Sequence, residues 1–267
     1  MNHTTKIFTR LGLVSALALG ALSALAAPPT PLSPEIKQIL VGRTNVYLVK
    51  SDPMVLIDSG GKEDLVALQA GLKAEGVSVA QIKAILLTHG HADHAGLAAE
   101  LKRRSGALLV AGAADTVMTK AGHNDELKPT NFMARVLKRF AIDPGYEAFE
   151  ADLKVDAPID LQRFGMQGKG MQMPGHTPGS LVLVLDDGRA FVGDMMLGGW
   201  MGGAIFADTA GEHYFQDDLE RNHANIVALL KLPIHTFYLG HGGPVTRASV
   251  LQGFGLSDPL AHNTSTQ

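Results

Sequence analysis

The stretch from Thr88 to His94, with the sequence THGHADH, restricts the fold of this chain more than any other. Three histidines and one aspartate lie within six positions, and the small residues Gly90 and Ala92 between them let the backbone turn tightly. The apolar run 82–87 directly before them is typical of a buried strand. Unpaired imidazoles buried at the end of a strand would cost several kcal/mol. The cluster therefore predicts a metal site.

The spacing of these residues resembles the metal-binding signature of the metallo-β-lactamase-fold superfamily. That resemblance implies three further ligands downstream, and matching motifs occur in order as PGHTPG, FVGD and LGHGG. The implied ligands are His89, His91, Asp93, His94, His176, Asp194 and His241. The resemblance extends over nearly all of the chain after residue 40. It implies an α/β fold, an αββα sandwich of two mixed β-sheets flanked by helices.

Six to seven nitrogen and oxygen ligands are too many for one zinc ion, which takes four. We therefore predict two Zn²⁺ ions, with other divalent metals, including iron, as alternatives. In the family pattern one ion is held by His89, His91 and His176, the second by Asp93, His94 and His241, and both by Asp194. A water shared by the ions would have its pKa lowered to ~7 and would supply hydroxide to attack a carbonyl group. We also assign a catalytic role to Asp93.

Two residues are candidate partners that orient the ligands. Asp58 follows an earlier apolar run and could bond a ligand imidazole, although it could also simply form a turn. Thr88 is the second candidate, and Thr177 and Ser180 are weaker ones. The remaining histidines lie outside the motifs and are expected on the surface or in packing: His123, His213, His223, His235 and His262. Only the His213-Tyr214 pair is kept in view, because a tyrosine hydroxyl near the metals could donate to an oxyanion.

The segment after Asp194, MMLGGWMGG, offers apolar side chains beside the predicted metals. We predict that Met195, Trp200 and Met201 bind substrate; the alternative is a glycine-rich loop anchored by core methionines. Many metallo-β-lactamases carry Cys or Ser where this chain has Asp194, and the chain contains no cysteine. The aspartate resembles the glyoxalase II and lactonase branches instead.

These features predict a hydrolase of an ester, a lactone or a related carbonyl bond. The expected substrate is a small molecule with an apolar acyl part. Three alternatives stay open at this point. The first is β-lactam hydrolysis, which the fold resemblance and the expected export allow. The second is a mononuclear iron oxidoreductase of sulfur compounds, and the third is a metal-binding exported protein without catalysis.

The N-terminal segment predicts export. Lys6 and Arg10 precede an apolar run from residue 11 to 25 that ends in ALAA, the pattern of a secretory signal peptide. We predict a signal peptide at 1–26, a single domain at 27–267, and a periplasmic or secreted protein without a stable membrane anchor; an uncleaved anchor is the alternative. Removal of the two positive charges changes the net charge from −3 to −5. An acidic domain disfavours nucleic acid as a partner.

Hydrophobic periodicity predicts most of the elements around the motifs. Strands are expected at 45–50, 54–57, 82–87, 107–110, 180–185, 190–192 and 236–239, and helices at 63–75, 97–104 and 216–231. The region 115–150 is less regular. Its apolar residues near 132–140 recur at helical spacing, which indicates either a helix packed on the core or a lid over the site.

Overall fold

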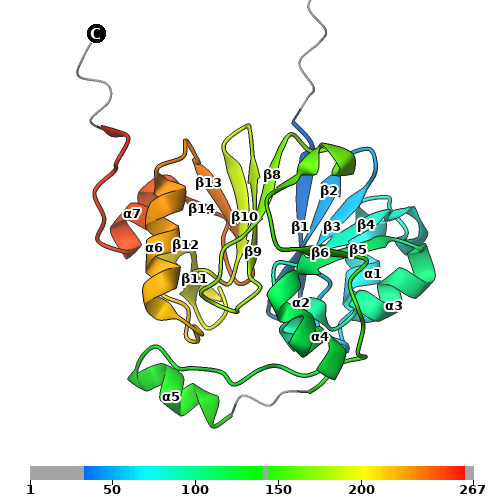
Figure 1. The fold of residues 1–267 in the computed structure, drawn as a ribbon, viewed down its shortest axis with the longest axis horizontal. Coiled ribbons are helices and arrows are strands. Elements are labelled where there is room, and N and C mark those ends of the chain that lie inside the picture. Colours follow the sequence, from blue (N-terminus) through cyan, green and yellow to red (C-terminus); the bar gives the residue numbers. More distant parts are fainter. Residues whose placement is uncertain (1–32, 141–143, 262–267) are drawn as a thin grey trace, which may run out of the picture. The chain divides into compact units, whose positions relative to one another are not determined.

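Two six-stranded β-sheets form the framework of the described chain, which comprises residues 33–140 and 144–261 of a computed structural model (Figure 1). The chain divides into the units 1–32 and 33–267, and only the second is described. The predicted signal peptide 1–26 lies outside the described residues. Across those residues, no helix combines the length and the apolar character that a membrane span requires.

The first sheet is built from the chain before residue 156, in the order β1-β2-β3-β4-β5-β6. Its strands are β1 (Glu35–Val41), β2 (Thr44–Lys50), β3 (Val55–Ile57), β4 (Ala84–Leu86), β5 (Leu108–Gly112) and β6 (Leu153–Val155). The first three pair antiparallel and the last four pair parallel. The sheet is therefore mixed, as predicted, although β1 was not expected from the sequence.

Helices cover the outer face of this sheet (Figure 1). They are α1 (Leu65–Ala74), α2 (Ala92–Ala95), α3 (Ala98–Ser105) and α4 (Thr116–Ala121), with short 3₁₀ turns at Val79–Gln81 and Ala113–Asp115. Helix α1 follows the predicted spacing, because Leu68 and Leu72 are the residues that it buries. Helix α3 ends at Gly106, whose φ of 68° is the left-handed conformation that glycine adopts easily.

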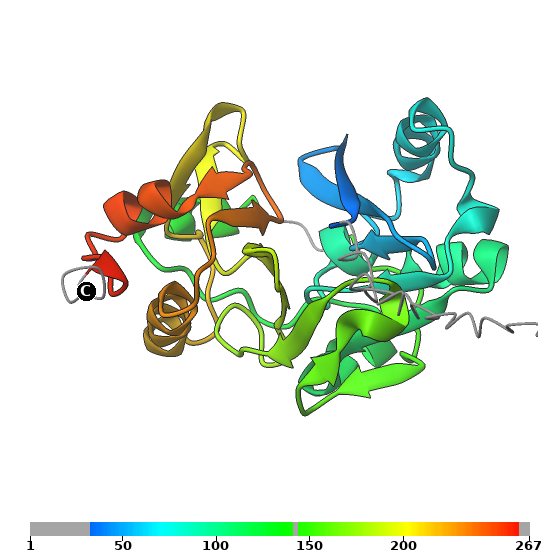
Figure 2. The same cartoon turned by 90° about the horizontal axis from the view of Figure 1, so that it is seen from above.

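The second sheet is built from the chain after residue 158, in the order β14-β13-β10-β9-β8-β7. Its strands are β7 (Ile159–Asp160), β8 (Gly168–Gln172), β9 (Leu181–Leu185), β10 (Arg189–Gly193), β13 (Thr236–Leu239) and β14 (Val245–Thr246). A 3₁₀ turn (Leu161–Phe164) joins β7 to β8, and α6 (Leu219–Leu230) and α7 (Arg247–Gly253) flank this sheet. The colours in both views show that the two sheets are built from separate halves of the chain (Figure 2).

The core has three parts that correspond to the layers of the sandwich. Strand β2 illustrates how alternate side chains divide between two of them: Leu48 packs with the helices of the first half, whereas Tyr47 packs with Phe191 between the sheets. The third part lies between the second sheet and α6, and includes Ile226 and Phe237. This layering of helix, sheet, sheet and helix confirms the predicted αββα sandwich.

Two segments differ from the predictions. The helix α5 (Phe132–Lys138) forms where the spacing indicated a helix, but Phe132 is 76% exposed and Phe140 after it is 75% exposed. The interpretation as a helix packed on the core is therefore wrong. The glycine-rich segment after Asp194 is a separate two-stranded sheet, the hairpin of β11 (Leu197–Trp200) and β12 (Ile205–Gly211).

Candidate metal centre

The predicted ligands all lie just beyond the ends of strands at one edge of the two sheets. The first four follow β4, in the loop that leads into α2 and in α2 itself. His176 lies between β8 and β9, Asp194 directly follows β10, and His241 follows β13. Because these strands end at one edge of the sandwich, residues far apart in the sequence reach a common site.

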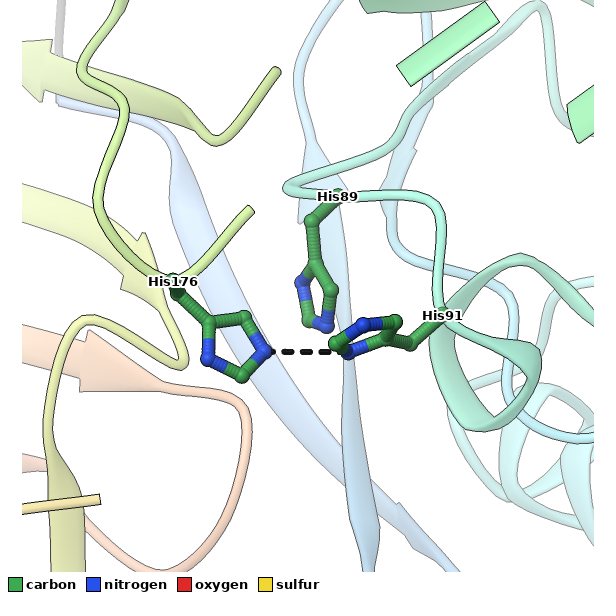
Figure 3. A group of neighbouring side chains, drawn as sticks. All are labelled: His89, His91 and His176. Atoms are coloured by element: carbon green, nitrogen blue, oxygen red, sulfur yellow. Dashed lines mark hydrogen bonds between the residues drawn. The ribbon is translucent and has the colours of Figure 1, made fainter. Parts of the chain in front are cut away.

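His89, His91 and His176 form the first group (Figure 3). Nε2 of His176 lies 3.0 Å from Nδ1 of His91, and the rings of His89 and His176 are perpendicular with centroids 4.6 Å apart. One nitrogen from each ring lies within 4.8 Å of the others. Three nitrogens that converge in this way, from a loop of each sheet, could hold one ion.

Asp93, His94 and His241 form the second group. Nε2 of His241 lies 3.2 Å from Oδ2 of Asp93 and 3.5 Å from Nε2 of His94. Nε2 of His94 lies 3.7 Å from the same Asp93 oxygen. The group thus offers two nitrogens and one oxygen to a second ion.

The carboxylate of Asp194 lies between the two groups. Its Oδ1 is 3.5 Å from Nε2 of His94, and its Oδ2 is 3.3 Å from Nε2 of His241. On the other side, Oδ2 lies 3.7 Å from Nε2 of His176 and 4.0 Å from Nε2 of His89. The side chain is therefore placed to contact an ion in either group.

Two buried atoms of this centre test whether a metal fits. Nε2 of His89 and Oδ1 of Asp194 are buried, and neither has a hydrogen-bond partner among the described residues. A buried polar atom without a partner costs about 1–3 kcal/mol. A divalent cation would compensate both atoms, because imidazole nitrogen and carboxylate oxygen are zinc ligands. The donors therefore fit a divalent metal.

Asp58 and Thr88 hold two of the imidazoles from behind. Oδ2 of Asp58 accepts a hydrogen bond from Nδ1 of His94 at 2.9 Å and from the Thr88 hydroxyl at 2.7 Å. The amide of Thr88 donates to Oδ1 of Asp58, and the Thr88 hydroxyl lies 3.1 Å from Nδ1 of His89. Asp58 has a positive φ of 64°, so it does form a turn, but its side chain also orients His94.

Asp115 is a buried residue that the sequence analysis missed. Its carboxylate accepts hydrogen bonds from the amides of Gly90 and Gly179 and from the hydroxyl of Thr177. Gly90 lies between two ligands of the first loop, and the other two residues belong to the loop of His176. Asp115 therefore ties together the two loops that form the first group. It lies in a 3₁₀ turn outside every motif, so no local pattern pointed to it.

Backbone carbonyls and one more carboxylate orient the remaining rings. Nδ1 of His176 donates to the carbonyl of Phe215 at 2.9 Å, and Nδ1 of His241 donates to the carbonyl of Arg43 at 2.7 Å. Nε2 of His91 donates to Asp125 at 3.2 Å, which leaves Nδ1 of His91 to face the site. Such partners fix the tautomer and direction of a metal-binding imidazole.

Charges within the site shift the pKa values of its members in opposite directions. Burial alone would raise the pKa of Asp194, but the nearby His241 and His94 outweigh it and hold the pKa well below its usual range. Burial would lower the pKa of His241, but Asp194 raises it to about 10. For His89 and His176, burial and the neighbouring imidazoles hold the pKa well below 6.5. These two rings are therefore neutral, which is the form that binds a metal.

His213 belongs to the one histidine–tyrosine pair that was kept in view, but the imidazole itself was not predicted at the centre. It was expected on the surface or in packing, but it is only 7% exposed and its Nε2 lies 3.2 Å from Oδ2 of Asp194. The expectation failed because His213 belongs to no motif and reaches the site through the fold. The predictions for His123, His223 and His235 are confirmed, since all three are exposed. His262 lies outside the described residues.

The predicted substrate-binding residues divide between core and surface. Met195 is 2% exposed and packs in the core of the second half, which fits the alternative of a core methionine anchor, and substrate binding by Met195 stays a prediction. Trp200 is 67% exposed and Met201 is also exposed, at the tip of the hairpin. The hairpin adjoins a ligand loop, because the amide of Gly198 donates to the carbonyl of His241 at 2.9 Å.

Known proteins match most of this chain. The family model described as the metallo-beta-lactamase superfamily matches residues 39–241. The probable metallo-hydrolase YqjP of Bacillus subtilis is 29% identical over 242 residues, which cover 84% of this chain and 72% of that protein. The hydroxyacylglutathione hydrolase GloC of Haemophilus influenzae is 27% identical over 180 residues, which cover 64% of this chain and 76% of that protein.

Solved structures resemble the fold. BJP-1, a subclass B3 metallo-beta-lactamase of Bradyrhizobium japonicum, superposes with a TM-score of 0.59 at 21% identity, covering 88% of this chain and 92% of that chain. The B3 metallo-beta-lactamase BLEG-1 gives a TM-score of 0.57 at 23% identity, covering 85% of this chain and 99% of that chain. At this level of identity the likeness extends to the fold and not to the substrate.

Proposed function

The chain belongs to the metallo-beta-lactamase superfamily, and its relatives carry the names of hydrolases. From this membership and the geometry of the centre, we propose that it is a binuclear, zinc-dependent hydrolase of ester, lactone or thioester bonds. Its status as a metal-dependent hydrolase follows from the family. The number of ions, their identity and the scissile bond are the proposal.

The position of Asp194 is the observation that carries the proposal of two ions. One carboxylate oxygen faces His94 of the second group, and the other lies within 4.0 Å of His89 and His176 of the first. A single four-coordinate ion would leave several of these buried donors without a partner. Two ions that share the carboxylate would use all of them.

When bound, a pair of zinc ions supplies an activated water, whose pKa falls to ~7, and polarises the carbonyl oxygen of the substrate. The residues of the chain keep the donors in place for that chemistry. Asp58 orients His94, and Asp115 joins the two histidine loops, so the donors need little rearrangement. No serine or cysteine nucleophile is needed, and the chain contains no cysteine.

The substrate that we propose is a small molecule with an apolar acyl part. The hairpin of β11 and β12 exposes Trp200, Met201, Ile205 and Phe206, and it adjoins the loop of His241. Helix α5 exposes Phe132 and Met133, and the segment before it is bonded to the backbone at Tyr214 through Thr130. Apolar side chains at the border of a charged centre suit an acyl chain better than a phosphate.

We further propose that the protein is exported and acts in the periplasm or outside the cell. The N-terminal pattern of two basic residues, an apolar run and small residues at its end supports this proposal. Fractionation of cells that express the full chain, with N-terminal sequencing of the recovered protein, tests it. A cytoplasmic protein with residue 1 intact would contradict export.

The test of the centre combines metal analysis with one substitution. Purified protein is expected to contain about two metal equivalents and to lose hydrolysis on chelation. Asp194→Ala should lower metal content and turnover together, because it removes the carboxylate that faces both groups. Asp186→Ala, at an exposed turn, is the matched control and should change neither. Full activity of metal-free protein, or of Asp194→Ala, would refute the proposal.

The substrate class is tested with a panel assayed at equal enzyme concentration. The panel contains an acyl ester of short and of long chain, an acyl lactone, an acyl thioester and a chromogenic β-lactam. We expect turnover of an ester, lactone or thioester, with a preference for the longer acyl chain. Turnover of the β-lactam alone would replace this proposal with β-lactam hydrolysis.

A further inference from the structure

His213 is a buried imidazole at the metal centre that lies outside the family's ligand motifs. It follows strand β12, and its Nε2 lies 3.2 Å from Oδ2 of Asp194. The corresponding distance is 3.3 Å for His241 and 3.7 Å for His176. His213 is therefore at least as close to the shared carboxylate as two of the residues already proposed as ligands.

The distances of His213 and His241 to Asp194 are those of atoms that bind a common ion, and the distance of His176 is slightly longer. Two ligands that each lie about 2.1 Å from one zinc are about 3.0–3.4 Å apart when the angle between them is right or tetrahedral. Donor atoms of His176, Asp194 and His213 all lie within 4.8 Å of one another. We propose that His213 is an additional metal donor, which binds the ion that His176 and Asp194 also contact. The inference rests on the proposed function, since it needs that ion to be present.

The hydrogen bond on the far side of the ring supports this role. Nδ1 of His213 lies 3.0 Å from the carbonyl oxygen of Phe215, the same oxygen that accepts from Nδ1 of His176 at 2.9 Å. With the proton on Nδ1, Nε2 keeps its lone pair and directs it toward Asp194. One carbonyl thus orients two imidazoles in the way that is usual for metal-binding histidines.

The opposite tautomer gives the competing role. The amide of Phe215 also lies 3.2 Å from Nδ1 of His213 and could donate to it. The proton would then be on Nε2, and His213 would be a hydrogen-bond donor to Asp194 instead of a ligand. The shorter contact to the carbonyl favours the ligand form, and the two forms differ in what a replacement side chain can restore.

The backbone around His213 is fixed on the side away from the site. The hydroxyl of Thr130 donates to the carbonyl of His213 at 2.9 Å, and the amide of Thr130 donates to the carbonyl of Tyr214 at 2.9 Å. The amide of Gln216 donates to the carbonyl of Lys128. The imidazole is therefore held at the centre by main-chain pairing with the segment before α5, and it is not carried there by a loose loop.

The experiment compares metal binding by the full protein and by two variants, His213→Ala and His213→Gln. Zinc affinity is measured by competition with a chromogenic chelator, and the coordination of Co²⁺ by visible absorption. Loss of a residue that only orients a ligand weakens binding about 10–100-fold. We expect a loss beyond that range, and a changed cobalt spectrum, for both variants. His235→Ala, an exposed histidine bonded to a carbonyl at 2.9 Å, should bind as the unchanged protein does.

Glutamine separates the two roles of His213. Its amide can donate to Asp194 but is a poor zinc ligand. If His213→Gln restores affinity and the cobalt spectrum while His213→Ala does not, or if neither variant differs from the unchanged protein, the inference is overturned. Unfolding curves in excess chelator confirm that each variant is folded. If the protein without substitutions takes up no divalent ion, the proposed function itself is overturned. If it binds the ion but the two His213 variants behave as an orienting role requires, only the role of His213 is overturned.

Discussion

Replacement of Asp115 by asparagine is expected to destabilise the protein and loosen the loops of the metal centre. The Asp115 side chain is 1% exposed. Its Oδ2 accepts from the amide of Gly90 at 2.9 Å and its Oδ1 from the amide of Gly179 at 2.7 Å. The two amides belong to the two loops that carry His89, His91 and His176, so one carboxylate holds both loops together.

The magnitude follows from the number of donors left without an acceptor. Asparagine has one carbonyl oxygen and one NH₂ group, so one of the two buried amides would lose its acceptor, at about 1–3 kcal/mol. In a domain of this size each kcal/mol changes Tm by about 2–4 °C. Asp115→Asn should therefore lower Tm by about 2–12 °C. Asp115→Ala removes both acceptors and should cost about 2–6 kcal/mol.

The assay is urea unfolding in excess chelator, so that metal binding does not contribute to the free energy. Zinc affinity is then measured separately and should also fall. Asp160→Asn is the control, because its exposed carboxylate accepts a single amide, that of Gln162, and asparagine caps a helix start equally well. An unfolding midpoint for Asp115→Asn equal to that of the unchanged protein would refute the argument, as would an equal loss for Asp160→Asn.

Two further predictions concern packing and pH. Gly112→Ala should cost about 1–3 kcal/mol in urea unfolding, because its Cβ would lie 1.8 Å from the carbonyl oxygen of Gly179; an unchanged midpoint would contradict this. Arg247 donates to Asp258 and lowers the pKa of that carboxyl to about 2, below its ordinary value of 3.8. The pair therefore stabilises the folded state above pH 3.8 and loses this contribution as the pH falls toward 2, so Asp258→Asn should flatten the acid limb of a stability–pH curve, and an identical limb would contradict the prediction.

Local sequence was sufficient for the parts of the site that are close together in the chain. The four donors after β4 follow one another, so their convergence depends only on a tight turn at a strand end. The downstream ligands were found through the resemblance to a family, and the fold brings His176, Asp194 and His241 to the same edge. Strands and helices with a clear periodicity were predicted within a few residues.

The remainder depended on contacts that no local pattern records. His213 and Asp115 have no neighbouring motif, and each reaches the site only because two distant segments pair. Periodicity identified α5 as a helix, but periodicity indicates which side chains share a face and not what covers that face. Met195 follows Asp194 directly in the sequence, yet its side chain packs in the core of the second half, which adjacency to a ligand does not reveal.

The distribution of the donors couples the metal to the assembly of the two sheets. His89, His91, Asp93 and His94 come from the first sheet, and the other proposed ligands come from the second. An ion that binds both sets only in the folded sandwich stabilises it by RT ln(1 + [L]/Kd), about 2.7 kcal/mol at a hundredfold excess over Kd. The chain has no cysteine with which to join the sheets covalently. The ligands that would hold the ions for catalysis would therefore also cross-link the two halves of the fold through those ions.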